Sequence, residues 1–173
     1  MKYTAINELN HFVYHDALLK KMTWRNKNLH WELSAVNATI ENSQNNFCKD
    51  MCIESAEIIF EQAHVVSIVS NAFQVYDSDN NLVESVEAIT AISEEYDTIL
   101  SKSLENYCFI MSMDGYQISE NGNYEACFNI ADLVTHGYYI TISFSKSIVS
   151  WEEFSGEAWY EESKWKTGQG DDS

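Results

Sequence analysis

The chain has 173 residues, 45% of them hydrophobic, and a formal net charge of −17 from 27 acidic and 10 basic side chains. This length and apolar content predict a single globular domain over residues 1–166 and argue against a disordered chain. The acidic surplus disfavours nucleic acids and anionic membranes as partners, because both attract lysine and arginine side chains.

The first residues, MKYTAINELNHFVYHDALLKK, contain no apolar run long enough for a secretion signal, and no later stretch approaches a membrane span. We therefore expect a cytoplasmic protein. In that compartment cysteines are expected to be free thiols rather than disulfides. The chain has four of them: Cys48, Cys52, Cys108 and Cys127.

The first half of the chain predicts short strands. Apolar and polar residues alternate over 18–24 and again over 29–35, on either side of the Asn-rich stretch Arg25–Asn28, which predicts a β-hairpin. One helical turn is expected around Ile6–Asn10. After a polar loop at 41–50, the alternation predicts three more strands, at 56–60, 65–69 and 73–76.

The middle of the chain contains the one predicted helix. A polar turn at 77–81 leads into residues 82–89, which fit either a strand or a helix. Ser93 is a suitable N-cap, and the apolar spacing that starts at Tyr96 predicts a helix near residues 94–104.

Beyond the helix the alternation returns. Strands are predicted at 107–113, 116–119 and 124–130, with turns at Asp114–Gly115 and at 120–123. Residues 138–144 also alternate, and the phase breaks near Lys146–Ser147, which predicts a bulge or corner.

The expected fold is therefore mainly β, an antiparallel β-sandwich or flattened barrel of about eight to ten short strands with one α-helix. The polar residues 167–173, TGQGDDS, are expected to form a disordered tail.

The segment 151–165 is the densest mixture of aromatic and acidic residues in the chain. Repulsion among its glutamates gives a monomer little stability, but a basic partner would be attracted by them. We therefore predict a partner-binding surface formed by Trp151, Glu152, Glu153, Glu157, Trp159 and Tyr160. A solvated edge strand, whose glutamates prevent aggregation, is the competing interpretation.

Other residues could in principle bind a metal ion or take part in catalysis, but each has a simpler interpretation. Asp77, Asp79 and Asn81 have the spacing of a calcium loop, but the glycine and glutamate that an EF-hand needs are missing, so a turn is expected. Cys48 and Cys52 lack a second tight pair, so no zinc site is expected. The His15–Asp16 pair has no accompanying nucleophile motif, and no glycine-rich phosphate loop occurs.

The layout resembles that of small acidic bacterial immunity-type proteins, which neutralise polymorphic toxins. The resemblance rests on residues 12–17, FVYHDA, and on the strand 140–144, ITISF. It implies that function resides in surface complementarity, without catalytic residues.

We therefore expect a non-enzymatic binding protein with an acidic surface for a basic protein partner, and no cofactor or metal. The alternative is a carbohydrate-active enzyme or another small hydrolase that uses the Trp- and Glu-rich segment as a cleft. A third possibility is an accessory subunit of a larger assembly.

Overall fold

The computed structural model describes residues 1–132 and 136–161, so the predicted tail at 167–173 lies outside the described residues. Over these residues the fold is mostly β, with antiparallel sheets and a helix, as the alternation and the helical spacing predicted. No helix in the described ranges is long and apolar enough to cross a membrane.

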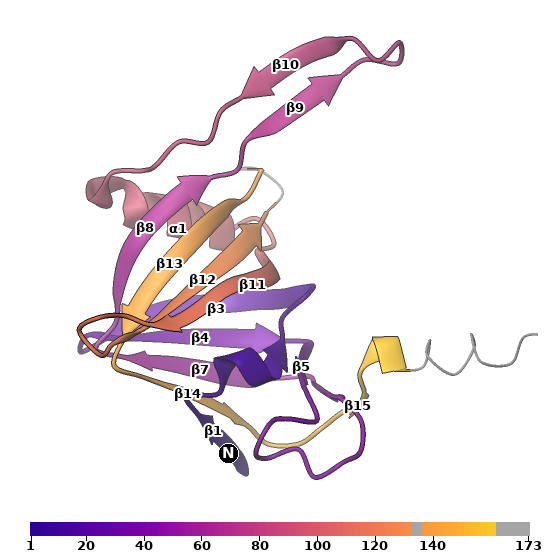
Figure 1. The fold of residues 1–173 in the computed structure, drawn as a ribbon, viewed down its shortest axis with the longest axis vertical. Helices are drawn as coiled ribbons and strands as arrows, with labels where there is room; N and C mark the ends of the chain where they lie inside the picture. Colours follow the sequence, from indigo (N-terminus) through magenta and orange to yellow (C-terminus); the bar gives the residue numbers. More distant parts are fainter. Residues whose placement is uncertain (133–135, 162–173) are drawn as a thin grey trace, which may run out of the picture.

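The largest sheet has nine antiparallel strands and is bent into two halves (Figure 1). One half contains, in spatial order, β1 (Tyr3–Ile6), β14 (Lys146–Trp151), β7 (Ala56–Glu61), β4 (Asn28–Ser34) and β3 (Ala17–Arg25). The other half contains β11 (Phe109–Ile118), β12 (Tyr124–Ala131), β13 (Tyr138–Phe144) and β8 (His64–Ser70).

The two halves meet at a narrow seam. β3 and β11 share only two register pairs, Leu18 with Phe109 and Ala17 with Ile110, and the strands then diverge. The chain crosses between the halves again at Ser145, between β13 and β14, where the Ser145 N–H donates to the Glu61 carbonyl at 2.9 Å. The phase break predicted near Lys146–Ser147 is this corner. A strand that changes partners there must also change its buried face.

The core lies between the two halves. The Trp31 ring of β4 packs against Phe128 of β12, with centroids 4.9 Å apart. Phe60 of β7 packs against Phe144 of β13 at 5.1 Å. All four side chains are fully buried, so the sheet closes on itself like a sandwich and the apolar faces of the strands meet.

Turn geometry explains the hairpin predicted between β3 and β4. Asn26 and Lys27 both adopt positive φ, 48° and 68°, which is the backbone of a two-residue type I′ turn. That turn matches the twist of the flanking strands, so the hairpin prediction is confirmed.

The helix α1 (Tyr96–Leu104) follows a 3₁₀ turn, η2 (Ser93–Glu95), and confirms the predicted helix. Its cap differs from the prediction. The Ile92 N–H donates to the Glu95 carboxylate at 3.3 Å, whereas the Ser93 hydroxyl bonds to Glu94. A second 3₁₀ turn, η1 (Leu9–His11), lies near the helical turn expected around Ile6–Asn10, and β1 precedes it.

The predicted turn at Asp114–Gly115 is wrong. β11 runs straight through it, so the separate strand expected at 116–119 belongs mostly to β11. The register against β12 shifts between Met113 and Gly115, and a second shift lies between Ile110 and Ser112. An Asp-Gly pair serves a bulge as well as a turn, and here the strand is held on both sides of the bulge by β12.

Two smaller sheets complete the fold. One contains β15 (Gly156–Glu157), β6 (Met51–Ile53), β5 (Val36–Ala38) and β2 (Phe12–Val13). The other is a two-stranded hairpin of β9 (Phe73–Tyr76) and β10 (Leu82–Val86), which settles residues 82–86 as a strand. Figure 1 shows this hairpin, here named the arm (residues 73–86), projecting away from the rest of the molecule.

Candidate functional site

Trp151, the first residue of the predicted binding surface, lies in the core. Its side chain is fully buried, stacked on Tyr3 at 5.4 Å and in edge contact with Phe12 at 5.8 Å. β14 alternates buried and half-buried residues, and Trp151 has the same phase as the buried Val149. Burial removes Trp151 from any surface that a partner could reach.

The rest of that predicted set lies at or near the surface. Glu152, Glu153 and Glu157 are exposed, and Trp159 is 62% exposed despite its size. The Tyr160 ring lies next to Trp159, with the two ring centroids 5.4 Å apart, but the Tyr160 side chain is only half exposed.

Asp50 connects this segment to the loop that precedes β6. One carboxylate oxygen accepts the Ile40 N–H at 2.8 Å, and the other accepts the Tyr160 hydroxyl at 2.9 Å. The Asp50 carbonyl accepts the Ala158 N–H, also at 2.9 Å. Burial, together with the hydrogen bond to Asp50 and its negative charge, raises the pKa of Tyr160, which therefore remains a donor.

The loop at 41–50 is held by its own side chains. The Asn45 side-chain amide donates to the carbonyls of Ala38, Thr39 and Lys49 at 2.9–3.1 Å. The Asn45 side-chain oxygen Oδ1 accepts the Phe47 N–H at 3.0 Å. The Phe47 ring, which is largely exposed, contacts the edge of Phe154 at 5.6 Å.

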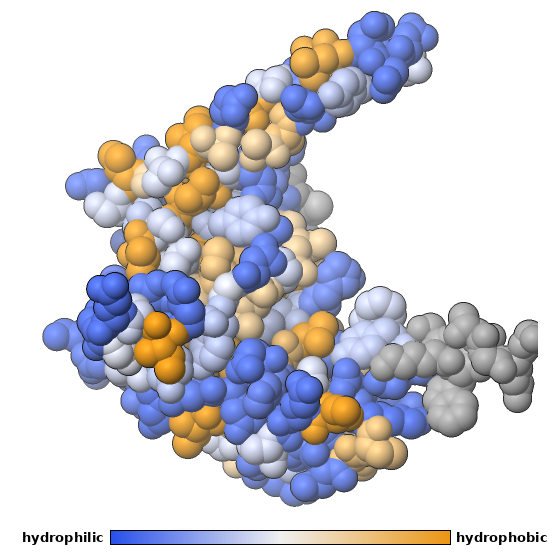
Figure 2. Space-filling view, viewed as in Figure 1, coloured by the Kyte–Doolittle hydropathy of each residue, from blue (hydrophilic) through white to orange (hydrophobic). Residues whose placement is uncertain are grey.

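Two segments distant in sequence therefore build one surface, here named the aromatic–acidic surface. It consists of the exposed apolar and acidic side chains of these two segments: Ile40, Phe47, Glu152, Glu153, Glu157 and Trp159. Figure 2 shows hydrophobic residues among hydrophilic ones at the lower right of the molecule. Lys49 forms an ion pair with Glu157 at 2.7 Å across the two segments.

Sequence reasoning found the second of these segments and missed the first. Ile40, Phe47 and Asp50 lie in a stretch whose composition indicates only a loop. Phe47 contacts Phe154 and Asp50 contacts Tyr160, and each contact spans more than a hundred positions. Ile40 joins them through its hydrogen bond to Asp50. The Asn-rich composition of the loop was the one available signal, because Asn side chains commonly fix loops by bonding to the backbone.

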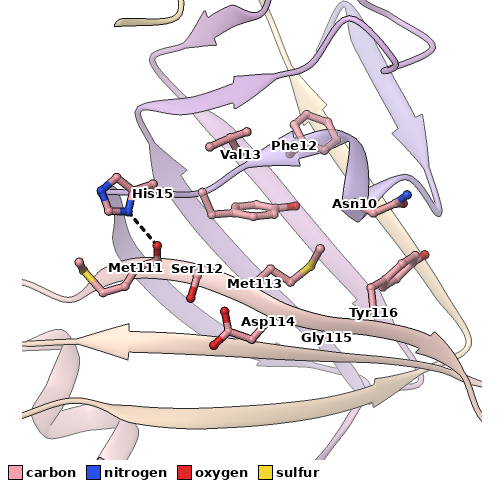
Figure 3. A pocket seen from close by; sticks show the side chains of 11 residues that line it. Asn10, Phe12, Val13, His15, Met111, Ser112, Met113, Asp114, Gly115 and Tyr116 are labelled. Atoms are coloured by element: carbon pink, nitrogen blue, oxygen red, sulfur yellow. Dashed lines mark hydrogen bonds between the residues drawn. The ribbon is translucent and has the colours of Figure 1, made fainter. Parts of the chain in front are cut away.

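A cleft elsewhere in the molecule has a volume of about 430 Å³. It lies between residues 12–15 and β11 (Figure 3), and both bulges of β11 fall beside it. His15 Nδ1 lies 3.0 Å from the Met111 carbonyl, which can only accept, so Nδ1 carries the proton. Asp16 approaches His15 Nε2 at 3.5 Å, and both side chains are exposed.

This arrangement orients an imidazole but does not pair it with a nucleophile. Ser112 and Asp114 point to the opposite side of β11 from His15 (Figure 3). Among residues 1–132 and 136–161, no Ser, Thr or Cys side chain hydrogen-bonds to His15. A hydrolase with a histidine-activated nucleophile needs that contact, so this cleft has no geometric support for that mechanism. The alternative of a carbohydrate-active enzyme that uses the Trp- and Glu-rich segment stays a separate hypothesis, because it depends on carboxylates and not on His15.

The calcium-loop pattern is a turn, as predicted. One Asp77 carboxylate oxygen accepts the N–H groups of Asp79 and Asn81 at 2.9 and 2.8 Å. The Asn81 side-chain amide also donates to this carboxylate, and these hydrogen bonds lower the pKa of Asp77.

The four cysteines form no disulfide. Cys48 is exposed, whereas Cys108 is buried and receives a hydrogen bond from the Ser103 hydroxyl at 3.3 Å. In the described part of the chain, no group of three or more His, Cys, Asp and Glu side chains is placed to hold a metal ion.

No protein-family model, curated protein or solved structure matches this chain.

Proposed function

We propose that this chain is a non-enzymatic binding protein whose acidic surface recognises a basic protein partner. The observation that carries the proposal is the aromatic–acidic surface, where Ile40, Phe47 and Trp159 are largely exposed beside carboxylates. Aromatic side chains anchor interfaces because each buries a large area at a small cost in conformational entropy.

The net charge of the protein also favours a basic partner. A net charge of −17 gives the molecule a strong negative potential. A basic partner would be steered by that potential and oriented by the glutamates around Trp159. The same potential opposes binding to nucleic acids and to anionic membranes.

The hydrogen bonds of Asp50 make this surface suitable for recognition. They hold residues 156–160 against the loop at 39–50 before any partner arrives. A surface ordered in advance loses less entropy on binding than a mobile one, so more of its contact energy is available as affinity.

The resemblance to immunity-type proteins suggests a finer form of this function, the neutralisation of a basic toxin. The residues that carry the resemblance shape the fold, since Phe12, Ile140 and Phe144 are all buried. We include a cytoplasmic location in the proposal, because free thiols fit a reducing compartment.

The test begins with capture of a partner from the source cells and continues with purified components. The variant carries Glu152→Gln, Glu153→Gln and Glu157→Gln. We expect its association with the purified partner to be slower at low salt by roughly threefold to thirtyfold, because three attractive charges are gone. Stopped-flow mixing measures the rate, and circular dichroism shows whether the fold is retained.

The control replaces three exposed glutamates from other parts of the surface, with Glu94→Gln, Glu105→Gln and Glu120→Gln. Its net charge equals that of the first variant, so it isolates position from total charge. An equal loss of rate in both variants would contradict a binding surface around Trp159, and failure to capture a basic protein would contradict the proposal.

A further inference from the structure

Within residues 1–132 and 136–161, the arm is a two-stranded sheet without a third strand. β9 and β10 pair only with each other, while neighbouring β8 belongs to the nine-stranded sheet. At its base, the Phe73 ring lies 4.4 Å from the His136 ring. The returning chain bonds to β8 there, since the Ser70 N–H donates to the Ile89 carbonyl and the Ala91 N–H to that of Ile68.

The arm leaves apolar side chains in water on both of its faces. Register pairs Tyr76 with Leu82 on one face and Val75 with Glu84 on the other, and Val83 lies in the bulge between them. Leu82 is 53% exposed and Val83 is 66% exposed. Figure 2 shows apolar atoms along the arm and a hydrophilic tip. A two-stranded hairpin with both faces in water is only marginally stable by itself.

The tip, in contrast, is well ordered by its own hydrogen bonds. The Asp77 carboxylate closes the turn through Asp79 and Asn81 at 2.8–2.9 Å. The turn therefore fixes the register of the two strands, while no other element of the described chain pairs with them. This combination presents a shaped but uncovered apolar surface.

The charge of this region determines what kind of molecule can cover it. The sequence contains no lysine or arginine from residue 50 to residue 101. The arm and its return carry Asp77, Asp79, Glu84 and Glu87, all exposed. A second copy of this chain, at −17, would be repelled, whereas lysine or arginine side chains beside apolar ones would fit.

We propose that the arm is a second docking surface, covered by a partner segment that alternates basic and apolar side chains. Apolar side chains of that segment contact Tyr76, Leu82 and Val83, and its cations pair with Glu84 and Glu87. The inference shares the basic partner of the proposed function but concerns a separate surface, so each can fail alone.

The test is a nuclear magnetic resonance titration with two synthetic probe peptides. Both have the same alternating valine, isoleucine and tyrosine residues, with lysine between them in one peptide and glutamate in the other. We expect the lysine peptide to shift the amide signals of residues 73–87 and to slow their hydrogen exchange, and the glutamate peptide to do neither.

Variants then assign the contacts. The double variant Leu82→Ser and Val83→Ser should bind the lysine peptide about tenfold more weakly or worse, since tenfold corresponds to only about 1.4 kcal/mol of lost apolar contact. Glu84→Gln with Glu87→Gln should weaken binding about threefold or more at low salt and reduce its salt dependence. Ile118→Ser is the control, because Ile118 is equally exposed on β11 and should leave binding unchanged.

Four results would overturn the inference. The first two are arm signals that do not shift and equal binding of the two peptides. The third is that arm variants which circular dichroism shows to be folded bind the lysine peptide like the wild type. The fourth is that the arm signals change with protein concentration alone. The last would identify a second copy as the occupant. Shifts confined to residues 40–50 and 152–160 would contradict the arm as a docking surface but would support the proposed function.

Discussion

Asp50 is the residue on which the aromatic–acidic surface depends most. Its carboxylate accepts hydrogen bonds from Ile40 and Tyr160, which belong to different segments. Asp50→Ala should lower the free energy of unfolding by about 1–3 kcal/mol, because two donors lose a charged acceptor. It should also speed amide exchange at 156–161. Denaturant unfolding and hydrogen exchange measure the two effects.

Tyr160→Phe is the matched comparison, since it removes one of those hydrogen bonds and keeps the ring. We expect a loss of about 1 kcal/mol or less from it. Unchanged exchange at 156–161 in Asp50→Ala would show that other contacts hold the segment in place.

Cys108 gives the protein a pH-dependent stability. Burial raises the pKa of its thiol to about 11, partly offset by the hydrogen bond from Ser103. An unfolded cysteine titrates at about 8.5, so between the two values the unfolded chain has lost a proton that the folded chain keeps. Stability from this group is therefore complete below about pH 8.5 and declines as pH rises toward 11, by roughly 2–3 kcal/mol.

Denaturant unfolding at pH 8 and pH 10.5, with reductant present, measures this decline. Cys108→Ala removes the titration, so its stability should fall less over the same interval. The burial of Tyr116, which raises its pKa to about 12, adds a further decline above pH 10 in both proteins. Identical declines in wild type and variant would contradict the assignment to Cys108.

At the residue scale, alternation was sufficient to place Trp151. Val149 and Trp151 share a phase, and that phase is the buried one, so the strand pattern itself argued against an exposed Trp151. No local pattern could place Asp50, because its partner Tyr160 lies 110 residues away.

Among the strands, β12 contributes the centre of the core. Its Phe128 ring contacts Tyr14, Trp31 and Phe60, with centroids 4.9–6.2 Å apart. Phe128→Ala should cost about 3–5 kcal/mol through lost burial and the cavity left behind, a large share of the stability of a domain. The control Ile118→Ala, at an exposed position on the neighbouring strand, should change stability by about 0.5 kcal/mol or less.

Chemical denaturation measures both variants. A cost for Phe128→Ala as small as that of Ile118→Ala would show that the two halves of the sheet do not pack through this ring. A large cost confined to Phe128→Ala would support the packing of the two halves.

Individual strands were predictable from the sequence where one face of the strand is buried and the opposite face is exposed to solvent. The hairpin of β3 and β4 was predictable because period-two alternation flanks a two-residue turn. The bulge at Asp114–Gly115 was not, because the same dipeptide suits a turn and only the partner strand β12 decides between them.

For the whole molecule, alternation with a single helical window predicted an antiparallel β fold with one helix, and this prediction is confirmed. The strand order could not be predicted. β1 pairs with β14 and β3 with β11, pairings set by the closure of the core rather than by local sequence. The sequence of the arm likewise predicts two ordinary strands, because no local sequence pattern indicates that a hairpin is separate from the main sheet.

The central claim is that negative charge guides a basic protein partner to this molecule. The most direct measurement is the association rate constant with the purified partner as a function of ionic strength. We predict that the rate falls by about tenfold or more between low salt and 0.5 M salt, because screening shortens the reach of exposed charges to a few ångströms. A rate constant that does not change with ionic strength would contradict the claim.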